Sequence, residues 1–403
     1  MNVNDKNNFI NLSVTNRKKS MFIDDIKKYS NILSGKVKDK SVLVIGGAGT
    51  IGSSFIKAIL KFKPSKLVVV DTNENGLTEL TRDLRSENKQ FLPEIFLTYP
   101  MNFGDDVFEK MFKDLGHFNI VANFAAHKHV RSEKDIYSIE SMIENNVFKA
   151  KKFLDLLLKS KPDNFFCVST DKAANPVNVM GASKKIMEEV IMSYSSKINI
   201  TTARFANVAF SNGSLLAGYL QRMNKDQPIS CPSDVKRFFV SPEESGQICM
   251  LACLLGKTGE IFFPKLDIDN LVSFKKITED FFKYLKIKPL ECSSENEARK
   301  LAKERINNDT YPVFYFKSNT SGEKLFEEFY TNSDEIDLNS YTSLGVIKKT
   351  SNTSKFSYDD LDVEFKSLFS NRRFMKSDII KIFKKYLPNF NHIETGKNLD
   401  QKM

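Results

Sequence analysis

Residues 42–52 read Val-Leu-Val-Ile-Gly-Gly-Ala-Gly-Thr-Ile-Gly, a short apolar run followed by a G-x-x-G-x-x-G pattern. The apolar run predicts a buried strand, and residues 53–60 continue with a helical pattern. Such a turn brings free backbone N–H groups and the positive end of a helix dipole to one point, where a pyrophosphate binds. Three spaced glycines alone would also suit an ordinary turn. The flanking strand and helix therefore favour a dinucleotide site.

The next apolar run, residues 67–70, ends in Asp71. A carboxylate at that position accepts hydrogen bonds from an adenosine ribose and repels a 2′-phosphate. The sequence therefore predicts that the cofactor is NAD rather than NADP.

The bulk composition favours a cytoplasmic protein. The chain has 403 residues, of which 41% are hydrophobic, so it can fill a core with a second lobe beside it. No apolar run approaches the roughly 18 residues that a membrane span needs, and residues 1–20 lack the apolar core of a signal peptide. The net charge of +10 comes from lysines spread along the chain, without a basic–aromatic pattern. We therefore expect no membrane span and no nucleic-acid partner.

The cysteines and histidines give no metal signature. The five cysteines form no C-x-x-C pair, and Cys249 and Cys253 lie in an apolar helical stretch where core packing is expected. His127 and His129 lack the further ligands that zinc spacing would supply. We predict no metal.

Strand and helix patterns alternate from residue 41 to about residue 205, which predicts an α/β fold with a doubly wound parallel sheet of the Rossmann type. Beyond that point the elements become shorter and richer in loops, which predicts a smaller C-terminal substrate lobe. Near the N-terminus, residues 21–33 have amphipathic helical spacing and are expected to pack on the main domain or on a second subunit. The strand candidates are 42–45, 67–71, 95–99, 119–124, 164–169 and 199–205. The expected divisions are an N-terminal helical extension (1–39), an NAD-binding domain (40–205), a mainly substrate-binding lobe (206–390) and a flexible tail (391–403).

A second informative stretch follows the apolar run 165–168. Thr170, Asp171 and Lys172 come after this predicted strand, where open α/β sheets hold their ligands, and Lys184 follows at the start of a helical pattern. A carboxyl and an amine at a strand end are placed to move protons. In an arbitrary protein the same triplet would be a solvated turn, so the glycine turn upstream carries the catalytic interpretation.

These motifs resemble the nucleotide-sugar 4,6-dehydratases among the extended short-chain dehydrogenase/reductases. More narrowly, they are similar to the UDP-N-acetylglucosamine 4,6-dehydratases of bacterial polysaccharide, flagellin-glycan and legionaminic acid pathways. Related dehydratases that act on dTDP-glucose or GDP-mannose carry glutamate where this chain has Lys172. The similarity covers about residues 40–335 and rests, besides the glycine turn, on 123–130, 146–147, 169–173, 175–176, 178–184, 204–208, 237–239, 322–325 and 327–328.

The resemblance implies a reaction in which hydride leaves C-4 of the sugar, a proton leaves C-5, the C-6 hydroxyl departs as water, and the hydride returns to C-6. It makes Asp171 the acid and Lys172 the base, and it lets Thr170 hydrogen-bond the C-4 hydroxyl. Lys184 would bind the nicotinamide ribose and supply positive potential where the alkoxide develops.

The same resemblance implies the remaining binding residues. The NAD site would use Gly46, Gly49, Thr50, Ile51, Gly52, Asp71, Asn102, Ala125, Ala126 and Lys184. The substrate, UDP-N-acetylglucosamine or a related nucleotide sugar, would contact Lys128, His129, Asn207, Arg237 and Glu323.

Met180 is the informative departure, because short-chain dehydrogenases usually have tyrosine four residues before the lysine. Methionine cannot ionise, so another group must accept the C-4 hydroxyl proton, and Asp171 acting through Thr170 is the candidate. One branch of the dehydratases carries the same methionine, and its members tend to retain the configuration at C-5. Smaller departures are Ile45, where threonine is common, and residues 320–321, where many relatives have Arg-Pro at the uridine end.

Two other functions remain open at this point. A 4-epimerase of the same superfamily would share the cofactor site but needs no acid–base pair aimed at C-5 and C-6. A non-catalytic regulator that binds a nucleotide sugar is conceivable because of Met180. The superfamily usually pairs subunits through helices that flank the sheet, so a homodimer or higher homo-oligomer is expected.

Overall fold

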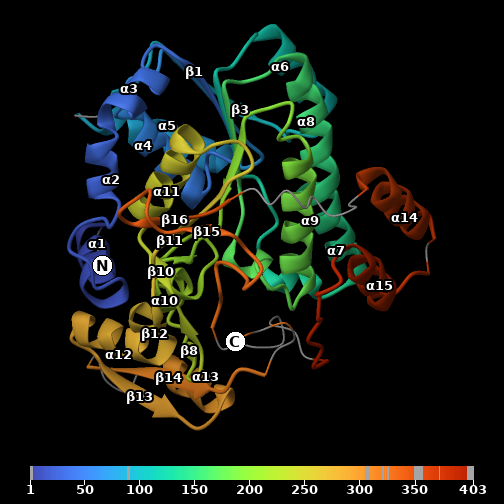
Figure 1. The fold of residues 1–403 in the computed structure, drawn as a ribbon. Coiled ribbons are helices and arrows are strands. Elements are labelled where there is room, and N and C mark those ends of the chain that lie inside the picture. Colours follow the sequence, from blue (N-terminus) through green and yellow to red (C-terminus); the bar gives the residue numbers. More distant parts are fainter. Residues whose placement is uncertain are drawn as a thin grey trace.

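The computed structural model describes residues 3–88, 91–304, 309–319, 322, 324, 326–348, 357–371 and 373–396. Within these residues the main sheet has nine strands in the order β15-β16-β11-β6-β5-β4-β1-β2-β3 (Figure 1). The strands from β3 to β11 pair in parallel, whereas β16 and β15 run antiparallel at one edge. Their bounds are β1 Ser41–Ile45, β2 Lys66–Asp71, β3 Ile95–Pro100, β4 Ile120–Asn123, β5 Asn164–Val168, β6 Ile200–Ala203, β11 Ile261–Pro264, β15 Ile336–Asp337 and β16 Leu344–Ile347.

Helices cover both faces of this sheet, which is why its central strands are almost continuously apolar and buried. The first face carries α3 Ser30–Val37, α4 Thr50–Leu60, α5 Glu74–Ser86 and α11 Pro242–Leu255. The second face carries α6 Asp106–Asp114, α7 Ile136–Ile143, α8 Lys149–Lys159 and α9 Val179–Ser193. The C-terminal helices α14 Tyr358–Ser370 and α15 Lys376–Tyr386 add to the second face (Figure 1).

The strand order reverses between β1 and β4, which pair with each other although β2 and β3 intervene in the sequence. Open α/β sheets bind their ligands at such a switch point, outside the carboxyl ends of the strands. The doubly wound parallel sheet predicted from the sequence is confirmed. Its reversal fixes where the site must lie.

A smaller lobe lies below the sheet in Figure 1 and has its own parallel sheet in the order β13-β14-β8. Two-stranded pairings β10-β7 and β12-β9 connect it with the main domain. The elements are β7 Asn207–Val208, α10 Leu215–Met223, β8 Ile229–Pro232, β9 Lys236–Arg237, β10 Phe239–Val240, β12 Val272–Ser273, α12 Phe274–Leu285, β13 Lys288–Cys292, α13 Glu295–Glu304 and β14 Thr310–Phe316.

The stretch from residue 206 to 390, expected to form mainly the substrate lobe, contributes to both bodies. β8, β13 and β14 build the lobe, whereas α11, β11, β15 and β16 return to the main sheet. The later helices α14 and α15 pack on the second face of that sheet. The lobe is therefore an insertion between elements of the main domain.

The N-terminal extension also divides between the two bodies. The amphipathic stretch expected at residues 21–33 forms two helices, α2 Ile23–Lys28 and α3, with a break at Tyr29. These helices pack on the first face of the main sheet through Phe22 and Leu33. The preceding elements, α1 Val3–Phe9 and η1 Ile10–Val14, instead complete the core of the small lobe.

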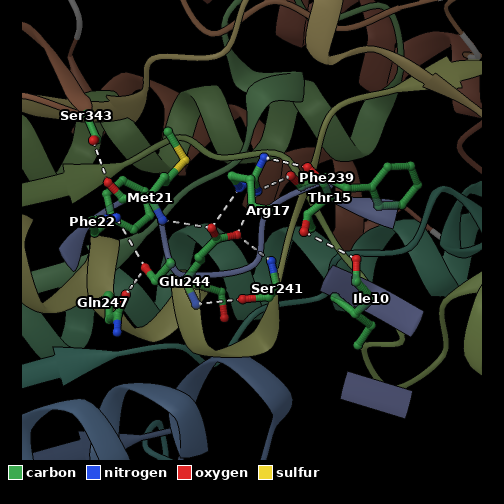
Figure 2. Close-up of polar contacts among 12 residues, drawn as sticks. Ile10, Thr15, Arg17, Met21, Phe22, Phe239, Ser241, Glu244, Gln247 and Ser343 are labelled. Atoms are coloured by element: carbon green, nitrogen blue, oxygen red, sulfur yellow. Dashed lines mark hydrogen bonds and ion pairs between the residues drawn. The ribbon is translucent and has the colours of Figure 1, made fainter. Parts of the chain in front are cut away.

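Residues 9–22 link these two attachments, and we call them the N-terminal clamp. Arg17 donates to both carboxylate oxygens of Glu244 at 2.8 and 2.7 Å, and also to the carbonyl of Phe239 at 2.9 Å (Figure 2). Glu244 in turn accepts from the backbone of Met21 and closes the capping box of α11 with Ser241. The clamp thereby ties the first turn of α11 to a strand that leads into the lobe.

In the part of the chain that the structure describes, no helix combines the length and the apolar character that crossing a bilayer demands.

Candidate functional site

The glycine turn after β1 has the geometry that its sequence predicts. Gly46 has a φ of +74°, and a Cβ at this position would lie 2.6 Å from the backbone nitrogen of Ala125. A Cβ on Gly52 would lie 2.3 Å from the carbonyl oxygen of Gly46. Glycine at these two positions therefore lets the first turn of α4 approach the ends of β1 and β4.

A cavity of about 290 Å³ lies at this turn, beside the carboxyl ends of β1, β2 and β4. Its lining contains every residue predicted for the NAD site except Lys184. These lining residues are Gly46, Gly49, Thr50, Ile51, Gly52, Asp71, Asn102, Ala125 and Ala126. The backbone donors of a helix N-terminus and an acid at the next strand end fit a dinucleotide.

Asp71 is oriented by the glycine turn itself. Its Oδ2 accepts from the backbone N–H of Ala48 at 3.0 Å, and its Oδ1 accepts from that of Asn73 at 2.9 Å. An ionised carboxylate retains further lone pairs after two such bonds. Asp71 can therefore hold the glycine turn and accept ribose hydroxyls at the same time.

The predicted acid and base meet at the end of β5. Asp171 and Lys172 lie in the short helix η4 Asp171–Ala173, and only 4% of Asp171 is exposed. Asp171 Oδ1 accepts from Thr170 Oγ1 at 2.8 Å and from Lys172 Nζ at 3.1 Å. A hydroxyl, a carboxylate and an amine are thus joined through one oxygen atom, which is a suitable arrangement for proton transfer.

Glu327 is a member of this cluster that the sequence did not assign. Its Oε1 lies 3.6 Å from Lys172 Nζ, and its side chain is buried. Burial raises the pKa of Glu327 more than the charge of Lys172 lowers it. The sequence indicated this residue only through the acidic pair 327–328, which belongs to the family resemblance.

The pKa of Lys172 reflects these two carboxylates. Burial lowers this pKa, but the negative charges of Asp171 and, to a smaller extent, Glu327 together raise it by more. The pKa of Lys172 therefore lies above the ordinary lysine value. The charge of Arg237 acts in the opposite direction on Lys172. Two carboxylates and one guanidinium therefore set the pKa of Lys172.

Helix α9 brings the remaining predicted catalytic residues to the same strand end. Asn178 caps it by accepting from the backbone of Gly181 at 2.7 Å. Lys184 is buried and donates from Nζ to the carbonyl of Val168 at 2.8 Å, and burial lowers its pKa. Met180 is buried as well, and its backbone N–H donates to Glu133 Oε1 at 3.1 Å. Met180 thus lies in the first turn of α9, and Lys184 lies in the second turn with its amine at the end of β5.

Asn146 connects α9 with the wall of the 290 Å³ cavity. It exchanges hydrogen bonds with the backbone of His127, at 2.9 and 3.0 Å, and donates to Ser183 Oγ at 3.1 Å. His127 lines the cavity. This buried amide therefore fixes the distance between the two halves of the site.

Two further cavities, of about 210 and 400 Å³, continue from Lys128, which also lines the 290 Å³ cavity. Lys128 and His129 line both of them, and burial lowers the pKa of each side chain. Asn207 lines the smaller one, and Arg131 and Arg222 line the larger. The three cavities extend from the glycine turn into the small lobe, and several basic side chains line them.

Arg237 lies in β9, is 6% exposed and donates from Nη1 to the carbonyl of Lys236. Its charge acts on both Lys172 and Glu327, so it belongs to the acid–base cluster rather than to the lining of the three cavities. Glu323, predicted to contact substrate, lies outside the described residues, as do Thr320 and Ser321.

All five cysteines are buried and unpaired. Burial raises the pKa of the Cys249 thiol well above its ordinary value. Across the described ranges, no group of three or more histidine, cysteine or acidic residues could hold a metal ion.

Residues 42–349 match the family described as polysaccharide biosynthesis protein. An uncharacterized membrane protein of Methanocaldococcus jannaschii is 34% identical over 58% of this chain and 69% of its own length. The capsular polysaccharide biosynthesis protein CapD of Staphylococcus aureus is 28% identical over 72% of the chain, which spans only 49% of that relative. An inverting UDP-N-acetylglucosamine 4,6-dehydratase of Campylobacter jejuni is 27% identical over 56% of this chain and 67% of its own. UDP-glucose 4-epimerases from Rickettsia species also match, with 29% identity over 60% of this chain and 71% of the Rickettsia canadensis protein.

Among solved structures, Pen from Bacillus thuringiensis superposes with a TM-score of 0.63 over 87% of this chain and 98% of its own, at 20% identity. A dTDP-glucose 4,6-dehydratase, DesIV from Streptomyces venezuelae, reaches a TM-score of 0.54 over 84% of this chain and 99% of its own, at 16% identity. At such identities the likeness concerns the fold.

Proposed function

The chain belongs to the polysaccharide biosynthesis protein family, and from that premise we propose that it is an NAD-dependent nucleotide-sugar 4,6-dehydratase. Its substrate is UDP-N-acetylglucosamine, and its product is the UDP-4-keto-6-deoxy-N-acetylhexosamine with the C-5 configuration retained. The observation that carries the proposal is the cluster of Thr170, Asp171 and Lys172 at the end of β5. It lies on the strand next to β4, whose end borders the predicted dinucleotide cavity.

The glycine turn and Asp71 would hold NAD, whose oxidised form would accept the hydride from C-4 and whose reduced form would return it to C-6. Thr170 hydrogen-bonds the C-4 hydroxyl, and its own bond to Asp171 gives the departing proton a route to the carboxylate. Asp171 then holds the proton that the leaving C-6 hydroxyl needs. The same residue thus accepts in the first step and donates in the second, so Met180 need not ionise.

Lys172 removes the C-5 proton in its neutral form. The ketone at C-4 acidifies that proton, so a lysine base suffices once its own proton has been released to solvent. Lys172 then returns a proton to the same face of the flat intermediate, and retention follows without a second acid on the opposite face. Lys184, with its amine at the carbonyl of Val168, adds positive potential near the developing alkoxide.

The basic cavities beyond Lys128 support an anionic substrate. Arg131 and Arg222 line the larger cavity together with Phe274 and Phe316, and Arg237 lies beside the acid–base cluster. Guanidinium groups bind phosphates in a bidentate manner, and aromatic rings offer a surface for a base. These features suit a nucleoside diphosphate that spans the two bodies.

A 4-epimerase is the second candidate, because UDP-glucose 4-epimerases are among the relatives. Epimerisation needs no base at C-5, so it leaves Lys172 and its two carboxylates without a task. If the protein were a non-catalytic regulator, the cluster of Thr170, Asp171 and Lys172 would have no catalytic role.

The decisive experiment incubates the purified protein with UDP-N-acetylglucosamine and NAD⁺ and follows the product by mass and by proton NMR in deuterated buffer. We expect loss of one water and deuterium at C-5 of a D-configured product, UDP-2-acetamido-2,6-dideoxy-α-D-xylo-hexos-4-ulose. Unchanged mass with a new isomer indicates the epimerase, and an unaltered sugar indicates the regulator. An L-arabino product would contradict the single-base mechanism.

A further inference from the structure

The last described segment of the chain runs back toward the acid–base cluster. Residues 387–396, which we call the C-terminal strap, follow α15 and lie beyond the 42–349 range of the family match. Leu387 and Phe390 are buried in the core of the second face. Ile393 then donates to the carbonyl of Val177 at 3.0 Å and accepts from the backbone of Gly322 at 2.9 Å. The described part of the expected flexible tail is thus hydrogen-bonded to two loops.

Both of these loops lead into the proposed site. Gly322 has a φ of +69°, and a Cβ there would lie 2.4 Å from Cβ of Asn178. The carbonyl of Gly322 accepts from Asn178 Nδ2 at 2.7 Å, while the other amide atom of Asn178 caps α9. The strap, Gly322 and the start of α9 therefore form one continuous hydrogen-bonded path.

The buried acid Glu133 forms a second link between the C-terminal segment and α9. Glu133 Oε1 accepts from the backbone of Met180, as described above. Its Oε2 lies 3.5 Å from Lys376 Nζ and 3.6 Å from His392 Nε2, and the three side chains are 5%, 25% and 4% exposed respectively. One carboxylate thus faces the first turn of α9 with one oxygen and the C-terminal segment with the other.

We propose that the C-terminal strap is a positioning element of the acid–base cluster, with Glu133 as its buried anchor. The strap holds Gly322, and Glu327, five positions further along the chain, has its carboxylate 3.6 Å from Lys172 Nζ. The adjacent Glu328 is held from the catalytic side by Asn175 at 2.8 Å. Loosening the strap therefore shifts Glu327 and the cap of α9 together. The role in turnover rests on the dehydratase function proposed above.

The test exploits the fact that Ile393 acts through its backbone. Ile393→Pro removes the N–H that binds Val177, whereas Ile393→Ala keeps both backbone bonds and trims a side chain that is 39% exposed. We expect Ile393→Pro to lower kcat about 10–100-fold, because small misplacements of reacting groups have effects of that order. The Kd for NAD should stay within about twofold, since the strap does not touch the 290 Å³ cavity. Ile393→Ala should stay close to the wild type.

Hydrogen exchange gives a readout that does not need activity. Amides of residues 173–181 should exchange faster in Ile393→Pro but not in Ile393→Ala. Glu133→Gln serves as a second variant, because it keeps an acceptor for Met180 but removes the charge that faces Lys376 and His392; it should accelerate exchange in residues 387–396 as well.

Wild-type exchange of residues 173–181 in both Ile393→Pro and Glu133→Gln would overturn the proposal, as would equal kcat values for the proline and alanine variants. If Ile393→Pro does not fold, Glu133→Gln alone decides by the same exchange criterion. If the wild-type protein converts no nucleotide sugar, the proposed function fails, and the exchange comparison still judges the strap.

Discussion

Asp171 Oδ1 accepts hydrogen bonds from both nitrogens of Lys172, from the backbone N at 2.9 Å and from Nζ at 3.1 Å. The backbone hydrogen bond fixes the carboxylate of Asp171 next to Lys172, and the lysine amine donates to the same oxygen. Thr170 donates to the same oxygen. Proton exchange between the acid and the base therefore needs no rearrangement of the chain.

Lys172→Ala should abolish dehydration while NAD binding is kept, because Lys172 is assigned to the C-5 proton and does not line the dinucleotide cavity. Loss of a positioned general base typically lowers the rate by about 10²–10⁴. The turnover rate measures the loss of dehydration, and a cofactor titration measures NAD binding. Lys283→Ala, at an exposed lysine, is the control. Turnover above about a tenth of the wild-type value would exclude Lys172 as the base.

Glu327→Gln should move the rising limb of the pH–rate profile to lower pH. The charge of Glu327 raises the pKa of Lys172, so its removal lowers that pKa and yields neutral lysine at a lower pH. The pH dependence of kcat/KM measures this shift. The matched control is Glu328→Gln, whose carboxylate binds Asn175 instead of Lys172 and should leave the limb in place. A shift to higher pH would contradict the assignment.

Asp71→Ala should weaken NAD binding and reduce the discrimination against NADP. The ribose hydroxyls lose an acceptor, the 2′-phosphate loses its repulsion, and Ala48 loses the carboxylate that orients the glycine turn. Asp71→Asn separates these effects, since it keeps an oxygen for Ala48 but removes the charge. Fluorescence titration with both cofactors should show partial recovery of affinity in Asp71→Asn but low selectivity. Wild-type selectivity in both variants would mean that Asp71 does not face the ribose.

The buried pair of Glu188 and Arg204 should make stability depend on acid pH. Burial raises the pKa of Glu188, but the charge of Arg204, 2.6 Å away, lowers it by more. The net effect is a pKa lowered from 4.5 to about 2. A depressed pKa stabilises the fold above pH 4.5, and this contribution is lost as the pH falls toward 2.

Glu188→Gln should therefore lower the free energy of unfolding by about 3–5 kcal/mol at neutral pH, because it removes the nearer charge partner of a buried guanidinium and leaves only Asp334 at 4.0 Å. The difference from the wild type should shrink as the pH falls from 4.5 toward 2. Urea unfolding at several pH values measures this difference. A pH-independent difference would show that the charge of Glu188 is not responsible.

Arg17→Ala should destabilise the protein by about 1.5–3 kcal/mol, the usual range for hydrogen bonds to a charged group. Glu244, whose side chain is 2% exposed, would keep its bonds to Ser241 and Met21 but lose a bidentate partner (Figure 2). Arg17→Lys keeps the charge without the planar fork and should lie between alanine and the wild type. Urea unfolding measures the order, and equal stability of all three proteins would show that the clamp contributes nothing.

The main sheet could be predicted because its inner strands are buried on both faces. The six strand candidates between residues 42 and 205 correspond to β1–β6. The strands β11, β15 and β16 were not predicted, because they lie in the loop-rich part of the sequence beyond residue 205. Tyr29 divides one expected helix into two, a break for which the amphipathic spacing gave no signal.

The sequence signal is uneven across the predicted site for a related reason. The glycine turn and Asp71 follow strand ends, so local patterns predicted them, whereas Asn102, Ala125 and Ala126 were implied by the family resemblance. Glu327 comes from a loop more than a hundred positions away from Lys172, and an acidic pair in a loop has no periodicity that would assign it to the site. Glu133 and His392 likewise become informative only once folding has brought them to α9.

The N-terminal clamp has a consequence for biosynthesis. Phe9 packs against Phe210 and Phe281, and Arg17 binds a glutamate 227 positions further along the chain. During translation, residues 9–17 therefore leave the ribosome long before their partners at residues 210–281 have been synthesised, and they remain exposed to solvent until then. Contacts of such long sequence separation form late and slowly. The small lobe accordingly cannot complete its core during early translation, and nascent chains stalled before residue 244 should be captured by cellular chaperones through these unpaired apolar residues.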